Sequence, residues 1–286
     1  MQLLSGCSST SQLDKLDSTP TLYEEIQSEG ITVESTSSTG DLLPSEESFT
    51  PVGLNPDDYL NMYSSPTLDA QIISTIPASG TEIKIFGEPI ILENIPWVLA
   101  EYRQIQGWVD KNHLAIQKGE IPEELLKQGQ YVLAALRRYD YMLLADLVHP
   151  DYCLRFSPYP YLDENNLSFC PQDLPESANN AELYFWGRYD GTGDPIKMTF
   201  QAYHQDFVYD ADYFNAEMIG FDVELSSGNA INNIPDLYPD GVTIEYYFSG
   251  FDPQYGGMDW RSLRLVFIKD SNNWYLAAIV HGEWTI

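Results

Sequence analysis

The chain has 286 residues, enough for about two domains, and 43% of them are hydrophobic, so a sizeable core is available. Its 43 acidic and 14 basic residues give a net charge of −29, which argues against a nucleic-acid surface and against electrostatic docking on anionic lipid. No apolar stretch approaches the roughly 20 residues of a membrane-spanning helix.

The chain opens with residues 1–7, which end in Leu4-Ser5-Gly6-Cys7. This end resembles the lipobox of bacterial lipoproteins, in which the cysteine becomes the mature N-terminus and carries lipid. The resemblance implies a remnant signal, lipidation at Cys7, and a protein anchored by lipid on the extracytoplasmic side of the cell membrane. Only six residues precede Cys7, fewer than a signal needs. Either the start codon is placed too late, or the match is accidental and the protein is cytosolic.

Residues 8–56 contain 17 Ser or Thr and nine acids against one Lys. Such a composition buries too little apolar surface to offset chain entropy. We expect a disordered, extended linker, either a spacer that lifts a folded body off a membrane or merely a tail.

Residues 57–118 contain short apolar stretches separated by Pro, Gly and Ser, which predicts a small all-β barrel. The order Gln71–Pro77, Gly80–Gly87 and Gly107-Trp108-Val109 resembles a bacterial SH3 (SH3b) domain. Members of that family bind peptidoglycan or peptides, or act as spacers. The resemblance suggests an aromatic groove with Trp97, Tyr102 and Trp108, and the alternative, which we favour for Trp97, is that both tryptophans are core residues.

Residues 119–286 begin with helical spacing from Ile121-Pro122 through Arg138, and a second short helix from Met142 to Leu147 ends before His149-Pro150. A further helix is expected at 199–207. Helices followed by a long antiparallel series indicate an α+β domain. The expected strands cover 153–158, 183–189, 243–249, 261–268 and 274–283.

The segment Leu136–Pro150, the strand that begins at Leu154 and the closing strand Trp274–His281 resemble the NTF2-like (SnoaL-like) superfamily. That resemblance implies a cone formed by a curved antiparallel sheet with N-terminal helices. The domain also resembles the C-terminal half of an uncharacterised family of exported bacterial proteins that carry an SH3 module. No activity comes with that likeness, since superfamily members include isomerases, dehydratases and non-catalytic domains.

Few residues are candidates for catalysis, because the sequence contains no P-loop, dinucleotide fingerprint, nucleophile elbow or zinc-binding helix. The nearest set for acid–base catalysis is His149, Arg155 and His281, if they meet in the cone. The alternatives are a turn histidine before proline for His149 and a hydrogen-bonded core histidine for His281.

Ligand contacts are expected from polar and aromatic residues of the cone and from the loop Gly250–Arg264. In the alternative, this loop is a structural plug in which Arg261 pairs with Asp259 or Asp252. The candidates are Tyr159, Tyr161, Asp252, Tyr255, Trp260, Arg261 and Glu283.

Cys153 and Cys170 are either free thiols in a reducing cytosol or a disulfide in an exported protein. The acid-rich turns at 190–194 and 206–212 do not match EF-hand spacing, and we expect no metal and no cofactor.

The sequence therefore predicts a cell-envelope lipoprotein that binds without turnover. Its expected partners are peptidoglycan, an envelope protein or a small molecule, and its only membrane contact is the lipid. The alternatives are a pocket enzyme of the NTF2-like superfamily (isomerase, dehydratase or hydrolase) and a structural assembly domain.

Overall fold

The computed structural model describes residues 43–226 and 231–285 of the chain. In these ranges strands contribute more residues than helices, so the fold is mostly β. None of the described helices is long and apolar enough to cross a membrane. Cys7 and residues 8–42 of the expected linker lie outside the described residues.

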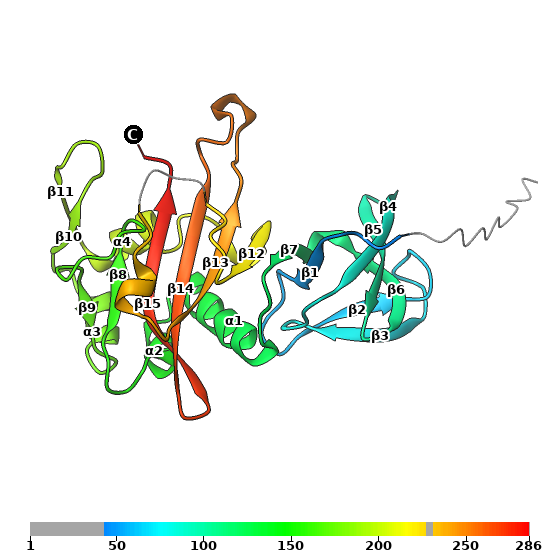
Figure 1. Cartoon of the computed structure of the whole chain (residues 1–286), viewed down its shortest axis with the longest axis horizontal. Coiled ribbons are helices and arrows are strands. Elements are labelled where there is room, and N and C mark those ends of the chain that lie inside the picture. The colour runs from blue at the N-terminus through cyan, green and yellow to red at the C-terminus, as the bar shows by residue number, and fades with distance from the viewer. Residues whose placement is uncertain (1–42, 227–230, 286) are drawn as a thin grey trace, which may run out of the picture. The chain divides into compact units, whose positions relative to one another are not determined.

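Residues 59–110 form one antiparallel sheet with the order β3-β2-β6-β5-β4 (Figure 1). Arg103 and Gln104 join β5 to β6 in a two-residue turn, and both adopt the positive φ that such turns need. Within the described residues this sheet is open, since β3 and β4 are edge strands, so the expected closed barrel is not formed. The strands are β2 (Tyr59–Tyr63), β3 (Ile72–Pro77), β4 (Lys84–Leu92), β5 (Ile95–Tyr102) and β6 (Ile105–Asp110).

A short strand, β1 (Ser48–Pro51), lies inside the segment expected to be a linker. Phe49 is 4% exposed and packs into the core of the five-stranded sheet, and the Thr50 hydroxyl donates a hydrogen bond to the carbonyl of Gly80 at 2.8 Å. The linker expectation is therefore wrong for residues 48–51. The average composition of a long Ser/Thr-rich segment conceals one short strand that is buried through an aromatic side chain.

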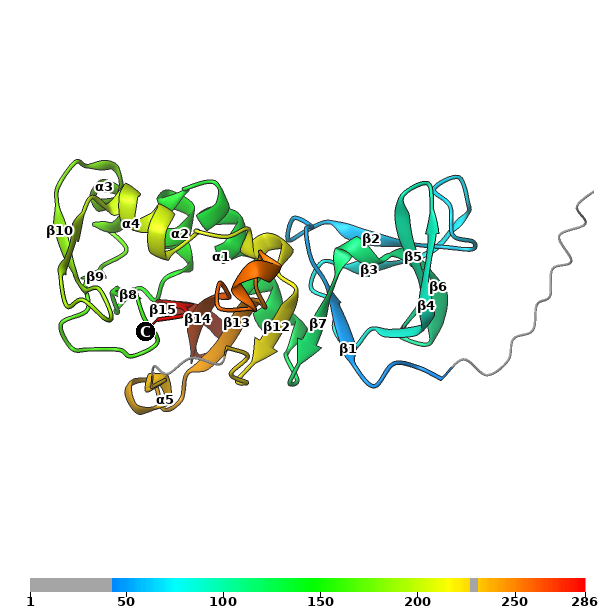
Figure 2. The same ribbon diagram turned by 90° about the horizontal axis from the view of Figure 1, so that it is seen from above.

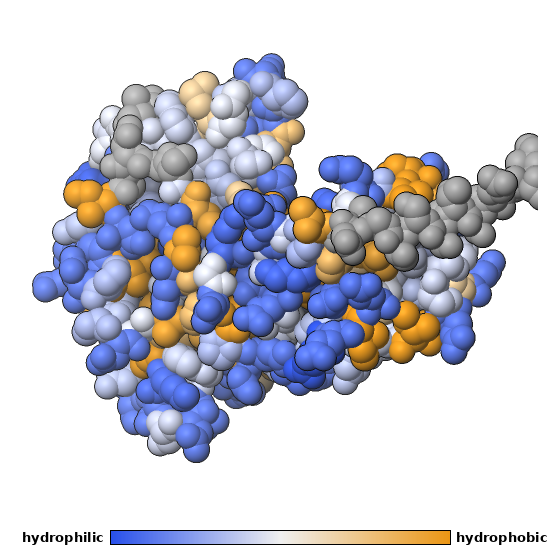
Figure 3. All heavy atoms as spheres, turned by 45° about the vertical axis from the view of Figure 1, so that its right-hand side comes forward, coloured by the Kyte–Doolittle hydropathy of each residue, from blue (hydrophilic) through white to orange (hydrophobic). Residues whose placement is uncertain are grey.

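Both edge strands of the five-stranded sheet carry exposed apolar side chains, and Figure 3 shows hydrophobic residues gathered in this part of the surface, at the right. These residues are Ile72, Ile73, Ile90, Ile91 and Leu92.

The larger sheet has eight strands in the order β1-β7-β12-β13-β14-β15-β8-β9. The pairs β7–β12 and β15–β8 are parallel, and all other neighbours are antiparallel. Because β7 pairs with both β1 and β12, the expected boundary at residue 118 falls at the end of a strand of this sheet. The remaining strands are β7 (Leu114–Lys118), β8 (Leu154–Ser157), β9 (Ser168–Phe169), β12 (Met218–Phe221), β13 (Val242–Phe248), β14 (Arg261–Asp270) and β15 (Asn273–Glu283).

The three helices expected from the sequence are present, and so are the five expected strands. Asp140 and Thr199 cap α2 and α4 by accepting the backbone N–H groups of Leu143 and Ala202. The helices are α1 (Glu123–Arg137), α2 (Tyr141–Leu147), α3 (Leu174–Asn179), α4 (Phe200–Phe207) and α5 (Ile234–Leu237). A two-stranded sheet of β10 (Tyr184–Arg188) and β11 (Pro195–Met198) completes the fold.

Helices α1 to α4 lie on one face of the eight-stranded sheet and α5 lies on the other (Figure 2). The helix side holds the largest buried cluster, which includes Phe156, Trp186, Phe200 and Tyr203. The α5 side buries a smaller cluster: Leu162, Ile234, Val266, Ala278 and Val280. The helix side, which was expected to hold a ligand, is thus filled by side chains.

Candidate functional site

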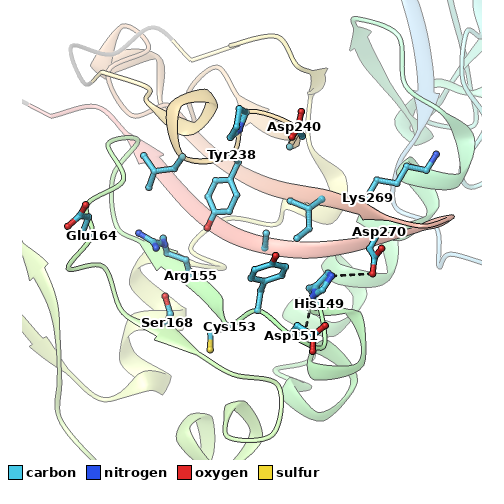
Figure 4. Close-up of a pocket in the computed structure, with 16 residues that line it drawn as sticks. His149, Asp151, Cys153, Arg155, Glu164, Ser168, Tyr238, Asp240, Lys269 and Asp270 are labelled. Atoms are coloured by element: carbon cyan, nitrogen blue, oxygen red, sulfur yellow. Dashed lines mark hydrogen bonds and ion pairs between the residues drawn. The ribbon is translucent and has the colours of Figure 1, made fainter.

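A pocket of about 930 Å³, here named the charged pocket, lies between the start of β8, the loop after α5 and the β14–β15 hairpin (Figure 4). Two of the three expected acid–base residues, His149 and Arg155, meet in it. The polar and aromatic side chains of its wall are His149, Asp151, Tyr152, Cys153, Arg155, Glu164, Ser168, Tyr238, Asp240, Lys269 and Asp270.

His149 is held through both ring nitrogens. Its Nδ1 accepts a hydrogen bond from the backbone N–H of Asp151 at 3.1 Å, and its Nε2 lies 3.6 Å from Asp270 Oδ2. Since an accepting nitrogen carries no proton, the proton of the neutral ring lies on Nε2 and faces Asp270. His149 is 4% exposed and packs against Tyr152 and Tyr275. This geometry fits the turn-histidine alternative better than a general base.

Arg155 extends from β8 toward the Tyr238 hydroxyl (Figure 4). Its Nη1 donates to the carbonyl oxygen of Asp163 at 2.9 Å, and its buried Nε has no hydrogen-bond partner in residues 43–226 and 231–285. Burial raises the pKa of Tyr238, and the positive charge of Arg155 opposes that effect. The pocket therefore contains a half-buried guanidinium beside a neutral phenol.

His281 lies on the other face of the sheet. Arg155 pairs with Ala278 in the parallel β8–β15 register, and Ala278 belongs to the α5-side core. His281 follows three residues later, and since strand side chains alternate it faces the helices, where its ring lies 5.6 Å from that of Phe207. The expected convergence of His149, Arg155 and His281 in one pocket is therefore wrong.

His281 instead joins a buried polar network around Asp210. Its Nδ1 donates to the carbonyl of Pro158 at 3.1 Å, and its Nε2 lies 3.2 Å from Asp210 Oδ2. The same Oδ2 accepts Arg261 Nε at 2.7 Å, and Oδ1 accepts the Tyr213 hydroxyl at 2.7 Å. Burial alone raises the pKa of Asp210, but the bonds from His281 and Tyr213 and the charge of Arg261 outweigh it and lower that pKa. Both carboxylate oxygens are occupied, as expected of a structural group.

Arg261 also lies 3.4 Å from Glu283 Oε2, and it pairs with these two carboxylates rather than with Asp259 or Asp252. The expected pairing within the loop is thus wrong, although the structural role is retained. Glu283 serves this ion pair.

The loop Gly250–Arg264 is held by its own polar contacts. Asp259 Oδ2 accepts the backbone N–H groups of Phe251 at 2.9 Å and Asp252 at 2.8 Å, and the Asp252 side chain caps the 3-10 turn Pro253–Tyr255. These contacts fit the structural alternative for Asp252.

The loop's aromatic residues differ in exposure. Trp260 is 3% exposed and packs 6.1 Å from Tyr247, which also fits the structural alternative, whereas Tyr255 is 49% exposed.

In the five-stranded sheet, Trp97 is 1% exposed and meets Tyr63 edge-on at 5.5 Å, so the core interpretation of Trp97 is confirmed. Tyr102 is also buried, and its hydroxyl donates to Glu123 Oε1 at 3.1 Å; burial and the charge of Glu123 raise its pKa to about 12. Trp108 is partly exposed on β6. Of the expected groove residues, Trp108 remains accessible and Tyr102 does not.

A second pocket, of about 1140 Å³, is here named the aromatic groove, and it contains Tyr159 and Tyr161. Three further apolar residues of its wall, which sequence reasoning missed, are at least one third exposed: Phe185 (44%), Tyr189 (38%) and Ile231 (72%). Polar side chains border the groove: Asp163, Asn165, Asn166, Arg188 and Asp190.

A buried ion pair on the α5 side was also missed. Arg264 and Glu245 are each 1% exposed and 3.2 Å apart, and Glu245 accepts hydrogen bonds from the Ser262 hydroxyl at 2.7 Å and the Leu225 backbone N–H at 2.8 Å. Charged residues inside a strand give no sequence signal that they will be paired and buried.

Cys153 and Cys170 are joined by a disulfide that links the start of β8 to the residue after β9. The bond therefore closes the β8–β9 hairpin. Arg155 lies in β8, and Tyr159 lies in the connection that follows β8. No group of three or more His, Cys, Asp or Glu residues placed to hold a metal ion occurs in residues 43–226 and 231–285.

Comparison of the sequence with protein-family models finds no matching model, and comparison with curated proteins finds no matching relative.

Proposed function

We propose that the protein is a non-catalytic binding module of the bacterial cell envelope and that its aromatic groove holds a saccharide-type ligand. The observation that carries this proposal is the exposure of Tyr161 (54%), Phe185 (44%) and Tyr189 (38%) along one groove. Pockets for small molecules combine apolar and aromatic walls with a few polar groups that fix orientation.

A sugar ring fits this wall chemically. Its C–H faces stack on aromatic rings, while its hydroxyl groups need donors and acceptors at the border, as Asn165, Asp190 and Arg188 provide. Tyr159 is half-buried behind them, and its hydroxyl accepts the Asp190 backbone N–H at 3.2 Å, which holds the groove wall in place.

Location in the envelope is supported by two independent features. The N-terminal Leu4–Cys7 resembles a lipobox. The Cys153–Cys170 disulfide is of a kind that persists in oxidising compartments outside the cytosol. The resemblance of residues 57–118 to SH3 domains and that of residues 119–286 to the NTF2-like superfamily favour the same class of exported binding protein.

The test is cosedimentation of the full chain, with Cys7→Ser to remove the lipid site, with purified peptidoglycan sacculi. We expect the parent to pellet and Tyr161→Ala and Phe185→Ala to pellet less. Tyr255→Ala, which removes an equally exposed ring outside the groove, should pellet like the parent. If Trp108→Ala alone abolishes pelleting, the five-stranded sheet is the wall site and the groove proposal fails.

A structural assembly domain is the second candidate, because the helix side of the sheet is filled by side chains such as Tyr141, Phe156 and Tyr203. If the protein has this role, neither the parent nor any variant should pellet with sacculi, and the full chain should retain a partner protein.

A further inference from the structure

The charged pocket combines cations and carboxylates that are not paired with one another. Arg155 and Lys269 line the pocket together with four carboxylates, Asp151, Glu164, Asp240 and Asp270. Among the described residues only Asp270 of these four takes part in an ion pair, with His149 at 3.6 Å. Figure 4 shows Glu164 on the side of Arg155, Asp240 near Tyr238, and Asp151 and Asp270 beside His149 on the other side of the pocket.

Arg155 is fixed in orientation. Its Nη1 is tied to the Asp163 carbonyl at 2.9 Å, and its guanidinium is directed toward the Tyr238 hydroxyl (Figure 4). The guanidinium also lies within hydrogen-bonding reach of the Tyr238 hydroxyl, and its buried Nε has no hydrogen-bond partner within residues 43–226 and 231–285. A guanidinium held this way is suited to a carboxylate.

Lys269 does not neutralise the four carboxylates, which we call the rim of the pocket. Its ammonium lies 5.1 Å from the centre of the Trp274 ring, so its charge is turned to that ring. The rim therefore has more negative than positive charge, and the exposed face of Tyr152 lies beside it.

These charges select a ligand by its own charge pattern. A simple anion would pair with Arg155 but be repelled by the carboxylates of the pocket. A simple diamine would pair with those carboxylates but leave Arg155 without an anionic partner. A molecule with one carboxylate and two amines satisfies both.

We propose that the charged pocket binds a diamino acid, either free or at the C-terminus of a short peptide. The carboxylate pairs with Arg155 and the Tyr238 hydroxyl, and the amines pair with Glu164 and Asp240. This proposal does not rest on the saccharide groove, since none of its residues lines that groove.

The test is calorimetric titration of the full chain carrying Cys7→Ser with four probes. L-Lysine and alanyl-lysine carry the complete pattern, cadaverine lacks the carboxylate, and norleucine lacks the second amine. We expect lysine or alanyl-lysine to bind at least about tenfold more tightly than cadaverine and norleucine, the factor for one charged hydrogen bond. Binding of alanyl-lysine alone would identify a peptide end as the ligand.

Variants separate recognition from folding. Arg155→Gln should weaken lysine binding about tenfold and leave cadaverine unchanged, and Tyr238→Phe, which keeps the ring, should weaken lysine to a smaller extent. Arg138→Gln is the matched control, because that exposed guanidinium lines neither pocket. Equal affinity for lysine and cadaverine, equal affinity for lysine and norleucine, or no binding of lysine and alanyl-lysine overturns the proposal, and none of these outcomes bears on sacculus binding by the groove.

Discussion

His281 Nε2 lies 3.2 Å from Asp210 Oδ2, while His281 Nδ1 lies 3.1 Å from the carbonyl oxygen of Pro158. Both partners are acceptors, so the ring makes both hydrogen bonds at once only when both nitrogens carry protons. The pair is then a buried imidazolium and carboxylate. It connects β15 to the chain after α4, and Arg261 adds a link to β14.

Replacing Asp210 tests this network. Asp210→Asn removes the negative charge that faces His281 and Arg261 and aims an amide donor at one of them. We expect a loss of about 3 kcal/mol in the free energy of unfolding at pH 7, as for a buried pair that loses one partner. Urea unfolding measures it, with Asp206→Asn, an exposed acid on α4, as the control that should stay within about 0.5 kcal/mol.

Acid should reduce the difference in the free energy of unfolding between Asp210→Asn and the parent. The pKa of Asp210 is lowered in the folded state, so its contribution is present above the unfolded pKa and is lost as the pH falls through the folded one. The two unfolding curves should approach each other below about pH 4. A difference that persists unchanged there would show that the network does not act through the carboxylate charge.

His204 should make the free energy of unfolding depend on pH in a second way. Burial lowers its pKa to about 4, and its Nδ1 lies 2.8 Å from the Tyr141 hydroxyl. The unfolded histidine binds a proton near pH 6.5, so stability is complete above that value and falls as the pH drops from 6.5 toward 4, by at most about 3 kcal/mol. Unfolding free energies measured between pH 7.5 and 4.5 check this.

The variant for that measurement is His204→Gln, which keeps a hydrogen-bonding side chain but does not titrate. Its unfolding free energy should vary less with pH than that of the parent over the same interval, whatever its absolute value. Parallel curves for the two proteins would assign the acid sensitivity to other groups.

Secondary structure was predictable where apolar periodicity was clear. The spacing of Leu125, Leu126, Val132 and Leu136 sets the buried face of α1, and the two longest strands, β14 and β15, each contain a continuous apolar run. Strand pairing was not predictable, because nothing local in Leu114–Lys118 specifies a parallel partner at Met218–Phe221. That pairing takes β7 away from the expected barrel.

The composition of each site depends on the direction of its side chains, and local sequence patterns indicate that direction only in part. Arg155 and His281 were expected on one side, but the face of each depends on the β8–β15 register, which no local pattern encodes. Phe185 was missed because it stands between Tyr184 and Trp186. Three consecutive aromatic residues show no alternation, so nothing indicates that Trp186 is buried and Phe185 is exposed.

Reduction should destabilise the hairpin shared by the two pockets. The Cys153–Cys170 bond closes a loop with a sequence separation of 17, for which chain entropy predicts about 3 kcal/mol. We expect unfolding of the Cys7→Ser protein to shift to lower urea on reduction. Thiol titration should find no free thiol before reduction and two after it. A Cys153→Ser, Cys170→Ser double variant should match the reduced protein and be insensitive to reductant; two free thiols before reduction would contradict the disulfide.

The two tryptophans of the five-stranded sheet should respond differently to truncation. Trp97 is 1% exposed and packs edge-on against Tyr63, so Trp97→Ala leaves a cavity that should cost about 3–5 kcal/mol. Trp108 is partly exposed on β6, and Trp108→Ala should cost about 1 kcal/mol. Urea unfolding of both variants measures the contrast. Since Trp108→Ala is expected to stay folded, its pelleting with sacculi reports on binding, whereas a similar large loss of stability in both variants would place Trp108 in the core and remove it from any ligand surface.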